Sequence, residues 1–305
     1  MTAISTPAVR QSMTARDWAM VLFLGAIWGG SFFFARIAVA EIPPLTLVLF
    51  RVAIAAAALH IYLAARGPSF RLALPYAASF VALALLNNII PFSLIFAGQT
   101  ELGAGIASVL NATTPFWTVI IANAATSDEK LSWNKIAGIL LGIAGTAVMI
   151  GPGLLAGIGG PVWAKLALIG AALSYGFAGV FAKRFRQVPP TIVATSQLTA
   201  STLIMIPVVL MTSGAGNLFV ASPPVWLAVV ALALLSTAFA YILFFSIVAS
   251  AGATNASLVT LVVPVSAIVL GAMFLGERLE LFEVGGMMLI GLGLVTIDGR
   301  LIKRR

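Results

Sequence analysis

The chain contains the same segment twice, and this repeat limits the architectures that it can adopt. Residues 81–86 and 230–235 both read VALALL, and the register between the two copies continues well beyond them. Matching positions include Ala107-Ser108 with Ala256-Ser257, Pro115 with Pro264 and, after a one-residue slip, Glu129 with Glu277. Both halves are strongly apolar, and each is predicted to hold an odd number of membrane spans. Two copies of such a unit lie in a membrane in opposite orientations, which is a common architecture of secondary transporters.

The composition indicates that most of the chain lies in a membrane. Hydrophobic residues make up 61% and charged residues 9%, whereas charged residues are about a quarter of a soluble domain. Apolar stretches long enough to cross a bilayer recur along the whole chain. We therefore predict an all-α integral membrane protein built from two inverted five-helix repeats, residues 1–152 and 153–305. The ten predicted spans are Trp18–Val39, Leu45–Ala65, Leu72–Phe96, Leu102–Ala122, Lys135–Ile150, Trp163–Phe181, Ile192–Thr212, Trp226–Val248, Ala253–Phe274 and Phe282–Ile297.

The positive charges are distributed unequally between the two sides of these predicted spans. Thirteen lysines and arginines fall on one side, Arg36, Lys165 and Arg278 fall on the other, and Arg51 lies inside a span. The positive-inside rule then places both termini in the cytoplasm. The basic end Lys303-Arg304-Arg305 is interpreted as a topology anchor beside anionic lipid and not as a nucleic-acid site. The chain has no cysteine, and we expect neither a cofactor nor a metal.

Asparagines and prolines inside the third and fourth spans mark a candidate substrate pathway. Asn87 lies four residues before Pro91, and Asn111 lies four residues before Pro115. Proline removes the hydrogen bond to the carbonyl four residues earlier, so each asparagine joins a freed acceptor to a polar side chain. Asn88 and Thr114 add polar groups beside them, and Pro264 marks a third helix break in the ninth span. These residues either line a transport cavity or form hydrogen bonds that only stabilise the helix bundle.

Three further side chains join the predicted pathway. Arg51 lies inside the second span, where it either extends to the membrane interface or meets a substrate carboxylate. Trp28 and Tyr241 are aromatic residues in spans expected to border the pathway. Aromatic residues in membrane helices more often serve packing or interfacial anchoring. Trp28 is favoured as a pathway residue because it opens the segment Trp28-Gly29-Gly30-Ser31, whose glycines permit close helix approach.

Taken together, these motifs resemble those of the drug/metabolite transporter superfamily and its EamA-type ten-span exporters. The resemblance rests on the duplicated halves, the segment at Trp28, the Ala-Ser…Pro pattern of the fourth and ninth spans, and the acidic turns Asp128-Glu129 and Gly276-Glu277. Within that group the chain is most similar to YddG-type aromatic amino acid exporters. The resemblance implies a bacterial inner-membrane protein that exports small metabolites, including aromatic amino acids, by alternating access. The second half departs from the pattern, because Ser174-Tyr175-Gly176 replaces the Trp-Gly pair.

Other function classes fit the residues less well. A membrane-embedded enzyme needs clustered carboxylates, histidines or a metal set, but the chain has one histidine and its nine acidic residues fall near span ends or in loops. An ATP-driven pump needs a phosphate-binding loop that is missing from the sequence. Export of drugs, purines or other hydrophobic metabolites stays open, as do a monomer and a homodimer. Because no carboxylate lies mid-span, we predict downhill movement of a zwitterion without obligatory proton exchange.

Overall fold

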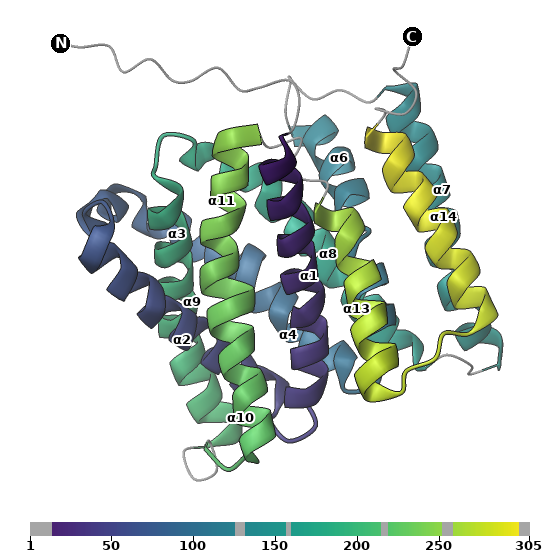
Figure 1. Cartoon of the computed structure of the whole chain (residues 1–305), viewed down its shortest axis with the longest axis horizontal. Helices are drawn as coiled ribbons and strands as arrows, with labels where there is room; N and C mark the ends of the chain where they lie inside the picture. Colours follow the sequence, from purple (N-terminus) through teal and green to yellow (C-terminus); the bar gives the residue numbers. More distant parts are fainter. Residues whose placement is uncertain (1–13, 126–131, 157–159, 215–218, 252–258, 299–305) are drawn as a thin grey trace.

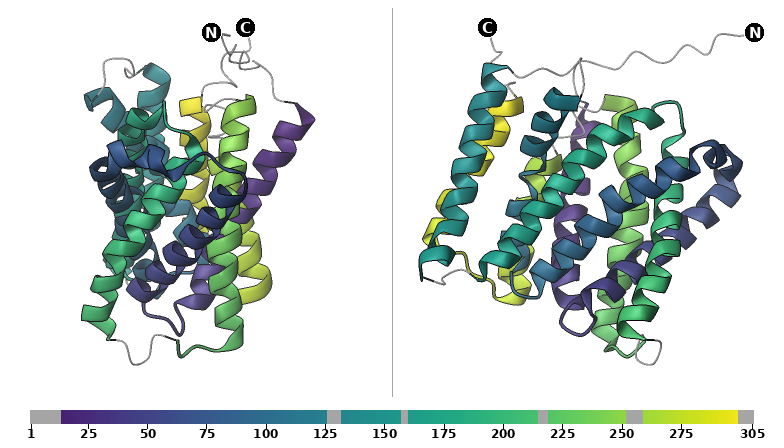
Figure 2. Two further views of the ribbon diagram at one scale, coloured as in Figure 1. Left: turned by 90° about the vertical axis from the view of Figure 1, so that its left-hand side faces the viewer. Right: turned by 180° about the vertical axis from the view of Figure 1, so that it is seen from behind.

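The computed structural model describes residues 14–125, 132–156, 160–214, 219–251 and 259–298, which are helical apart from short connections (Figures 1 and 2). No β-strand occurs in these residues. The helices are α1 Ala15–Ala38, α2 Pro44–Arg66, η1 Phe70–Tyr76, α3 Ala77–Ala84, η2 Leu85–Ile89, α4 Ile90–Gln99, α5 Ala104–Asn111, α6 Thr114–Ala125, α7 Trp133–Ala156, α8 Val162–Phe181, η3 Ala182–Phe185, α9 Pro190–Ser213, α10 Pro223–Val230, η4 Ala231–Phe239, α11 Ala240–Ala251, α13 Val259–Leu275 and α14 Leu281–Asp298.

Several of these helices suit a membrane by length and composition. Among the described residues, eight helical segments are long and apolar enough to cross a bilayer, and Val262–Leu275 and Leu281–Ile297 are shorter apolar helices. The chain is therefore an all-helical protein with multiple candidate spans, while the predicted total of ten includes these two shorter helices. The predicted start of the ninth span, Ala253, lies outside the described residues.

Local sequence explains where several helices begin. Thr14 and Asp17 form a capping box at the start of α1, in which the Asp17 amide donates to Thr14 Oγ1 and the Thr14 amide donates to the Asp17 carboxylate. The helices α2, α9 and α10 begin with a proline, at Pro44, Pro190 and Pro223 respectively. Proline suits this position because its fixed φ is helical and the first amides of a helix have no internal acceptor. Each proline therefore fixes the point at which its helix begins.

The two halves of the chain contact each other in reciprocal pairs. The first helix of the first half, α1, packs along α13, and α8 of the second half packs along α5 and α6. In the same way α2 contacts η4, α9 contacts η2, and α2 and α9 lie against each other. The first and second helices of each half thus pack against equivalent helices of the other half. A site at these contacts is built from both halves.

The glycines of α7 and α14 bring these two helices together at one edge of the bundle (Figures 1 and 2). A Cβ atom added at Gly145 would lie 2.6 Å from the Gly286 carbonyl oxygen, and one added at Gly138 would lie 2.6 Å from the Gly293 carbonyl oxygen. Backbones can approach this closely only where both residues lack a side chain. The close packing of these glycines is therefore a contact within the chain, between its two halves.

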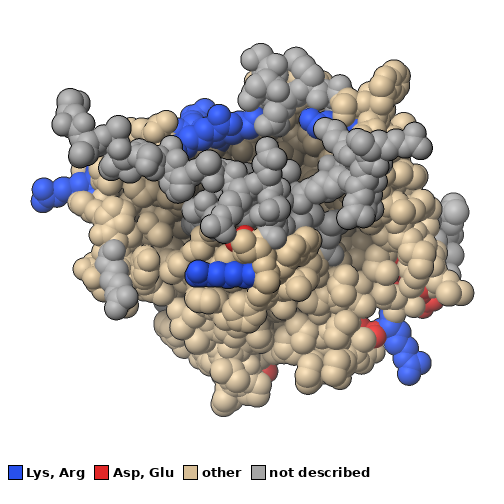
Figure 3. Space-filling view, turned by 45° about the horizontal axis from the view of Figure 1, so that its top comes forward, with Lys and Arg blue, Asp and Glu red and all other residues tan. Residues whose placement is uncertain are grey.

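Most of the described lysine and arginine side chains lie near one end of the bundle (Figure 3). The helix α1 begins and α14 ends at this end (Figure 1). Figure 3 looks onto it and shows lysine and arginine side chains around its rim, above a flank that is largely uncharged. An uncharged flank is what a lipid-facing surface requires, because a charge in hydrocarbon is costly. The assignment of this end to the cytoplasm stays a prediction.

Candidate functional site

One stretch of π-helix interrupts the third membrane-spanning segment of each half. The two stretches are η2, which spans Leu85–Ile89, and η4, which spans Ala231–Phe239. Both overlap a copy of the repeated VALALL segment, so they occupy equivalent places in the repeat. Pro91 follows η2 and cannot donate a hydrogen bond to the carbonyl of Asn87, which loosens the helix there. Single π-turns within α-helices are frequent at functional sites.

A network of hydrogen bonds joins η2 to two helices of the second half. The Asn87 amide donates to Gln197 Oε1 at 2.9 Å and to the Tyr241 hydroxyl at 3.4 Å. The Asn88 amide donates to Ser201 Oγ at 3.0 Å, and the Tyr241 hydroxyl donates to Asn88 Oδ1 at 3.4 Å. Asn88 and Ser201 are fully buried. The network therefore links η2, α9 and α11 in the interior of the bundle.

Arg51 of α2 makes the corresponding contact with η4. Its Nε donates to Thr237 Oγ1 at 3.0 Å, and its guanidinium carbon lies 3.8 Å from the centre of the Phe92 ring. Thr237 in turn donates to the Leu232 carbonyl five residues earlier, at 2.9 Å, which satisfies an acceptor within the π-helical stretch. Arg51 is buried, so its side chain points into the bundle. The alternative that it extends to the membrane interface does not describe this conformation.

The two contacts are related by the sequence repeat. Thr237 occupies the position equivalent to Asn88, and Gln197 is the counterpart of Arg51 in the second half. The second helix of each half therefore reaches the π-helical stretch of the other half. The chemistry differs, since one contact carries a positive charge and the other is neutral. We call Arg51, Asn87, Asn88, Gln197, Ser201, Thr237 and Tyr241 the central polar cluster.

Trp28, Asn111 and Thr114 lie outside the hydrogen bonds of the central polar cluster. The Trp28 ring packs against Phe244 at a centroid distance of 5.5 Å. The Thr114 hydroxyl donates to the Asn111 carbonyl at 2.7 Å, next to the break between α5 and α6. Asn111 Oδ1 is buried without a hydrogen-bond partner among the described residues. The structure thus brings together four of the seven predicted pathway residues and places these three elsewhere.

The three prolines differ in their local effect. Pro91 follows the π-helical stretch, and Pro115 follows the boundary at which α5 ends and α6 begins. Pro264 lies inside α13, which continues through it. The expected interruption of the ninth span at Pro264 is therefore not a break in that helix. A proline can remain within a membrane helix where neighbouring groups satisfy the freed carbonyl.

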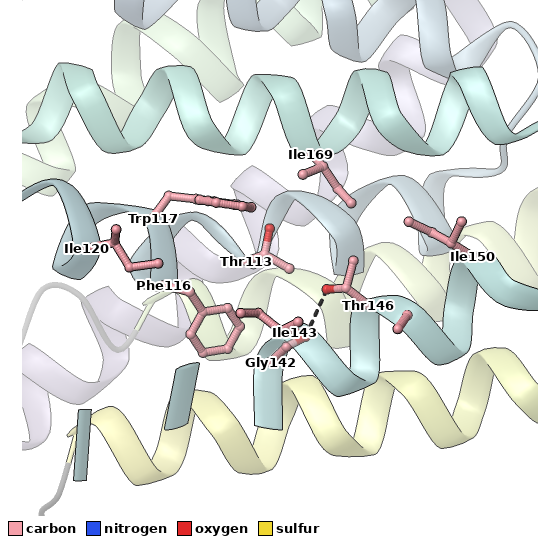
Figure 4. Close-up of a pocket in the computed structure, with 10 residues that line it drawn as sticks. Thr113, Phe116, Trp117, Ile120, Gly142, Ile143, Thr146, Ile150 and Ile169 are labelled. Atoms are coloured by element: carbon pink, nitrogen blue, oxygen red, sulfur yellow. Dashed lines mark hydrogen bonds between the residues drawn. The ribbon is translucent and has the colours of Figure 1, made fainter. Parts of the chain in front are cut away.

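A groove on the surface of the helix bundle has an almost wholly apolar lining. It has a volume of about 530 Å³ and lies between α6, α7 and α8 (Figure 4). Its lining residues are Thr113, Phe116, Trp117, Ile120, Gly142, Ile143, Thr146, Ala147, Ile150 and Ile169. The Thr146 hydroxyl donates to the Gly142 carbonyl at 2.9 Å, which leaves little polarity facing the groove. Such a lining suits a lipid chain better than a charged metabolite.

A second hollow, of about 780 Å³, opens between the connecting segments at the end of the bundle where α1 ends. Arg36, Glu41 and Glu277 are its charged lining residues. Hydrogen bonds cross between the halves here, because Glu41 accepts from the Ser222 amide at 2.6 Å and from its hydroxyl at 2.7 Å. Glu277 accepts from the Ala104 amide at 2.7 Å and so caps α5. These contacts hold this end of the two halves together.

Lys165 and Glu283 form a further buried charged region that the sequence placed only at span ends. Lys165 of α8 is fully buried and donates from Nζ to the Met149 carbonyl at 2.8 Å. Glu283 lies in the first turn of α14, and one of its oxygens accepts from the Glu280 amide at 2.8 Å. Lys165 therefore joins α8 to α7. This contact lies outside the central polar cluster.

Gln197, Ser201 and Thr237 are cluster members that the pathway prediction left out. Serine and threonine in membrane helices commonly bond to their own backbone, as Ser201 does with the Gln197 carbonyl at 2.7 Å. Their residue type alone is therefore a weak signal. The useful signal is the repeat, because Thr237 occupies the position equivalent to Asn88 and Gln197 that of Arg51.

Comparison with known proteins identifies relatives over nearly the whole chain. The transporter YedA of Escherichia coli K12, described as an uncharacterized inner membrane transporter, is 30% identical over 89% of this chain and 87% of its own. A probable amino-acid metabolite efflux pump of Salmonella typhimurium is 26% identical over 96% of this chain and 98% of its own. One solved crystal structure has the same fold, with a TM-score of 0.67 at 21% identity, and covers 96% of this chain and 99% of its own.

The family assignment comes from both halves of the chain. The model of the EamA-like transporter family matches residues 17–151 and again residues 162–297. The second match begins close to the predicted repeat boundary. The transporter YoaV of Bacillus subtilis, also uncharacterized, is 26% identical over 90% of this chain and 94% of its own. The chain belongs to the EamA-like transporter family and is a multi-pass membrane transporter.

Proposed function

We propose that this protein exports small metabolites, among them aromatic and other amino acids, across the bacterial inner membrane by alternating access. The central polar cluster carries the proposal, because it joins the two halves at their π-helical stretches. In secondary transporters, substrate sites lie between structural repeats where helices are interrupted. The name of the Salmonella relative, a probable amino-acid metabolite efflux pump, supports the substrate class, and that of YedA supports the inner membrane.

The proposed architecture has ten spans in two inverted five-helix repeats, residues 1–152 and 153–305, with both termini in the cytoplasm. The reciprocal contacts between α1 and α13 and between α8 and α5–α6 support a pseudo-twofold relation between the halves. Rocking of one half against the other would expose the central polar cluster first to one side of the membrane and then to the other. The contacts that Glu41 and Glu277 make would then close one end of the pathway.

Counterflow in proteoliposomes tests this function. Purified protein is reconstituted with unlabelled phenylalanine inside, and uptake of labelled phenylalanine is followed at equal pH on both sides and without a membrane potential. We expect transient accumulation of label, because no carboxylate lies in the central polar cluster to make proton exchange obligatory. Accumulation that appears only with an imposed proton gradient would contradict the uncoupled mechanism. Counterflow of labelled drugs or purines, but not of labelled phenylalanine, would contradict the substrate class.

Asn87→Ala provides the matching test of the site. Removing its side chain deletes the bonds to Gln197 and Tyr241, and we expect the initial rate of counterflow to fall about tenfold. Asn134→Ala is the control, since Asn134 lies at the start of α7 and is only partly buried. Equal counterflow by both variants would assign the asparagines to helix packing.

A further inference from the structure

Arg51 has a charge that no described acidic residue neutralises. Its position is eighth in α2, so it lies roughly 10 Å from the start of the helix at 1.5 Å per residue. Its side chain is only 7% exposed. The described contacts of its guanidinium are with Thr237 and with the rings of Phe92 and Phe96, all of them uncharged. A buried arginine in a membrane helix ordinarily pairs with an anion or marks a substrate path.

The contacts of Arg51 also fix how its donors are presented. Nε is occupied by Thr237 Oγ1, and Phe92 covers one face of the guanidinium at 3.8 Å. No described residue accepts a hydrogen bond from the two terminal nitrogens. These nitrogens form the edge that binds carboxylates in a planar, bidentate manner. Thr237 and Phe92 therefore orient the side chain and leave its carboxylate-binding edge available.

The surroundings of Arg51 are aromatic, and its described contacts carry no charge that balances the guanidinium. Tyr175 and Tyr241 lie near it, and their hydroxyls are neutral at physiological pH. The equivalent position in the second half is Gln197, which adds no charge. A single cation among aromatic side chains suits a ligand with one negative group and an apolar body. A dicarboxylate would leave its second charge without a partner, and a ligand with no anionic group would leave Arg51 unpaired.

We propose that Arg51 is the carboxylate-binding, specificity-determining residue of the pathway, and that the transported class is monocarboxylates with an apolar or aromatic body. This inference rests on the proposed transport function and narrows it. The amino group of a substrate is then secondary, because the cluster offers neutral amide and hydroxyl groups and no carboxylate to it. An α-amino acid satisfies the site, and so does the same molecule without its amino group.

Three aromatic probes separate the requirements of the site. Phenylalanine has both groups, 3-phenylpropionate lacks the amino group, and 2-phenylethylamine lacks the carboxylate. In counterflow by the wild-type protein, we expect transport of the first two and none of the third. Transport of 2-phenylethylamine at the rate of phenylalanine would overturn the inference while leaving the proposed transport function intact.

Substitution of Arg51 tests the residue itself. We expect Arg51→Gln to raise the KM for phenylalanine by about tenfold or more, and Arg51→Lys to recover part of the loss because it keeps the charge. Arg71→Gln is the matched control, because Arg71 is exposed in η1 and is not part of the central polar cluster or of the second hollow. An unchanged KM in Arg51→Gln would overturn the inference.

A binding measurement keeps the inference testable if no probe is transported. Thermal unfolding of the purified, full-length protein in detergent is followed in a gluconate buffer with phenylalanine, 3-phenylpropionate or 2-phenylethylamine added. A fourth sample has chloride as the buffer anion instead of gluconate. We expect the two carboxylates to raise the midpoint in the wild type and not in Arg51→Gln, including when counterflow is absent. A rise with chloride alone would show that the site holds an inorganic anion and would overturn the substrate assignment.

Discussion

Gly29→Ala tests the close packing of α1 against α13. A Cβ atom at Gly29 would lie 1.8 Å from Ser266 Oγ, 2.6 Å from the Val263 carbonyl oxygen and 2.8 Å from the Ala267 amide nitrogen. The serine side chain can rotate away, but the two backbone atoms can move only if α13 moves. Overpacking of this kind destabilises a fold by about 3 kcal/mol when the backbone must shift. We expect a loss of this size in unfolding by heat or by denaturing detergent.

The neighbouring glycine is a control that keeps the same substitution and helix. A Cβ atom at Gly30 would lie 3.6 Å from the Phe34 ring, which is an ordinary van der Waals contact. Gly30→Ala should therefore leave the free energy of unfolding unchanged or raise it slightly, because alanine favours a helix. Adding Ser266→Ala to Gly29→Ala should recover little stability, since the contacts with the α13 backbone remain. Equal stability of the Gly29→Ala and Gly30→Ala variants would refute the predicted helix spacing.

Three further predictions concern contacts between the halves. Glu277→Ala removes the acceptor for the Ala104 amide and should lower the free energy of unfolding by about 1 kcal/mol, with Glu277→Gln retaining part; equal unfolding curves would contradict this. Hydrogen bonds from the Ser222 hydroxyl and, to a smaller extent, from its amide lower the pKa of Glu41. The stability that these bonds contribute is therefore present above the ordinary pKa of a glutamate and is lost as the pH falls through the lowered pKa. Hydrogen exchange of the Ser222 amide, corrected for its intrinsic pH dependence, should therefore rise at that acidic pH in the wild type and show no such step in Glu41→Gln. Asn88→Ala should slow phenylalanine counterflow more than it lowers stability, and a loss of folding at unchanged specific activity would contradict a pathway role.

The long apolar stretches and the repeat were sufficient to predict an all-helical membrane protein, and the resemblance of its motifs indicated the family. The apolar stretches are long, and each repeated position constrains its counterpart, so helix type and approximate place follow directly. Local irregularity was harder to predict. Pro91 and Pro264 look alike in the sequence, yet one follows a π-helical stretch and the other lies in a continuous helix. The difference depends on which neighbouring groups satisfy the freed carbonyl, and that is a tertiary property.

The candidate site was predicted in part for the same reason. Burial in a membrane makes any mid-span polar residue notable, which identified Asn87, Asn88 and Arg51. The sequence does not say which helix faces which, so the partners Gln197 and Thr237 appeared only when α2 was found against η4 and α9 against η2.

The most direct test of the account is the position of a bound substrate. A map of the protein in lipid nanodiscs with phenylalanine, determined by electron cryomicroscopy, would show it. The account predicts the carboxylate at the terminal nitrogens of Arg51 and the ring among the aromatic side chains beside the central polar cluster. Phenylalanine bound instead in the groove lined by Trp117 and Thr146, with no density at Arg51, would contradict the central claim.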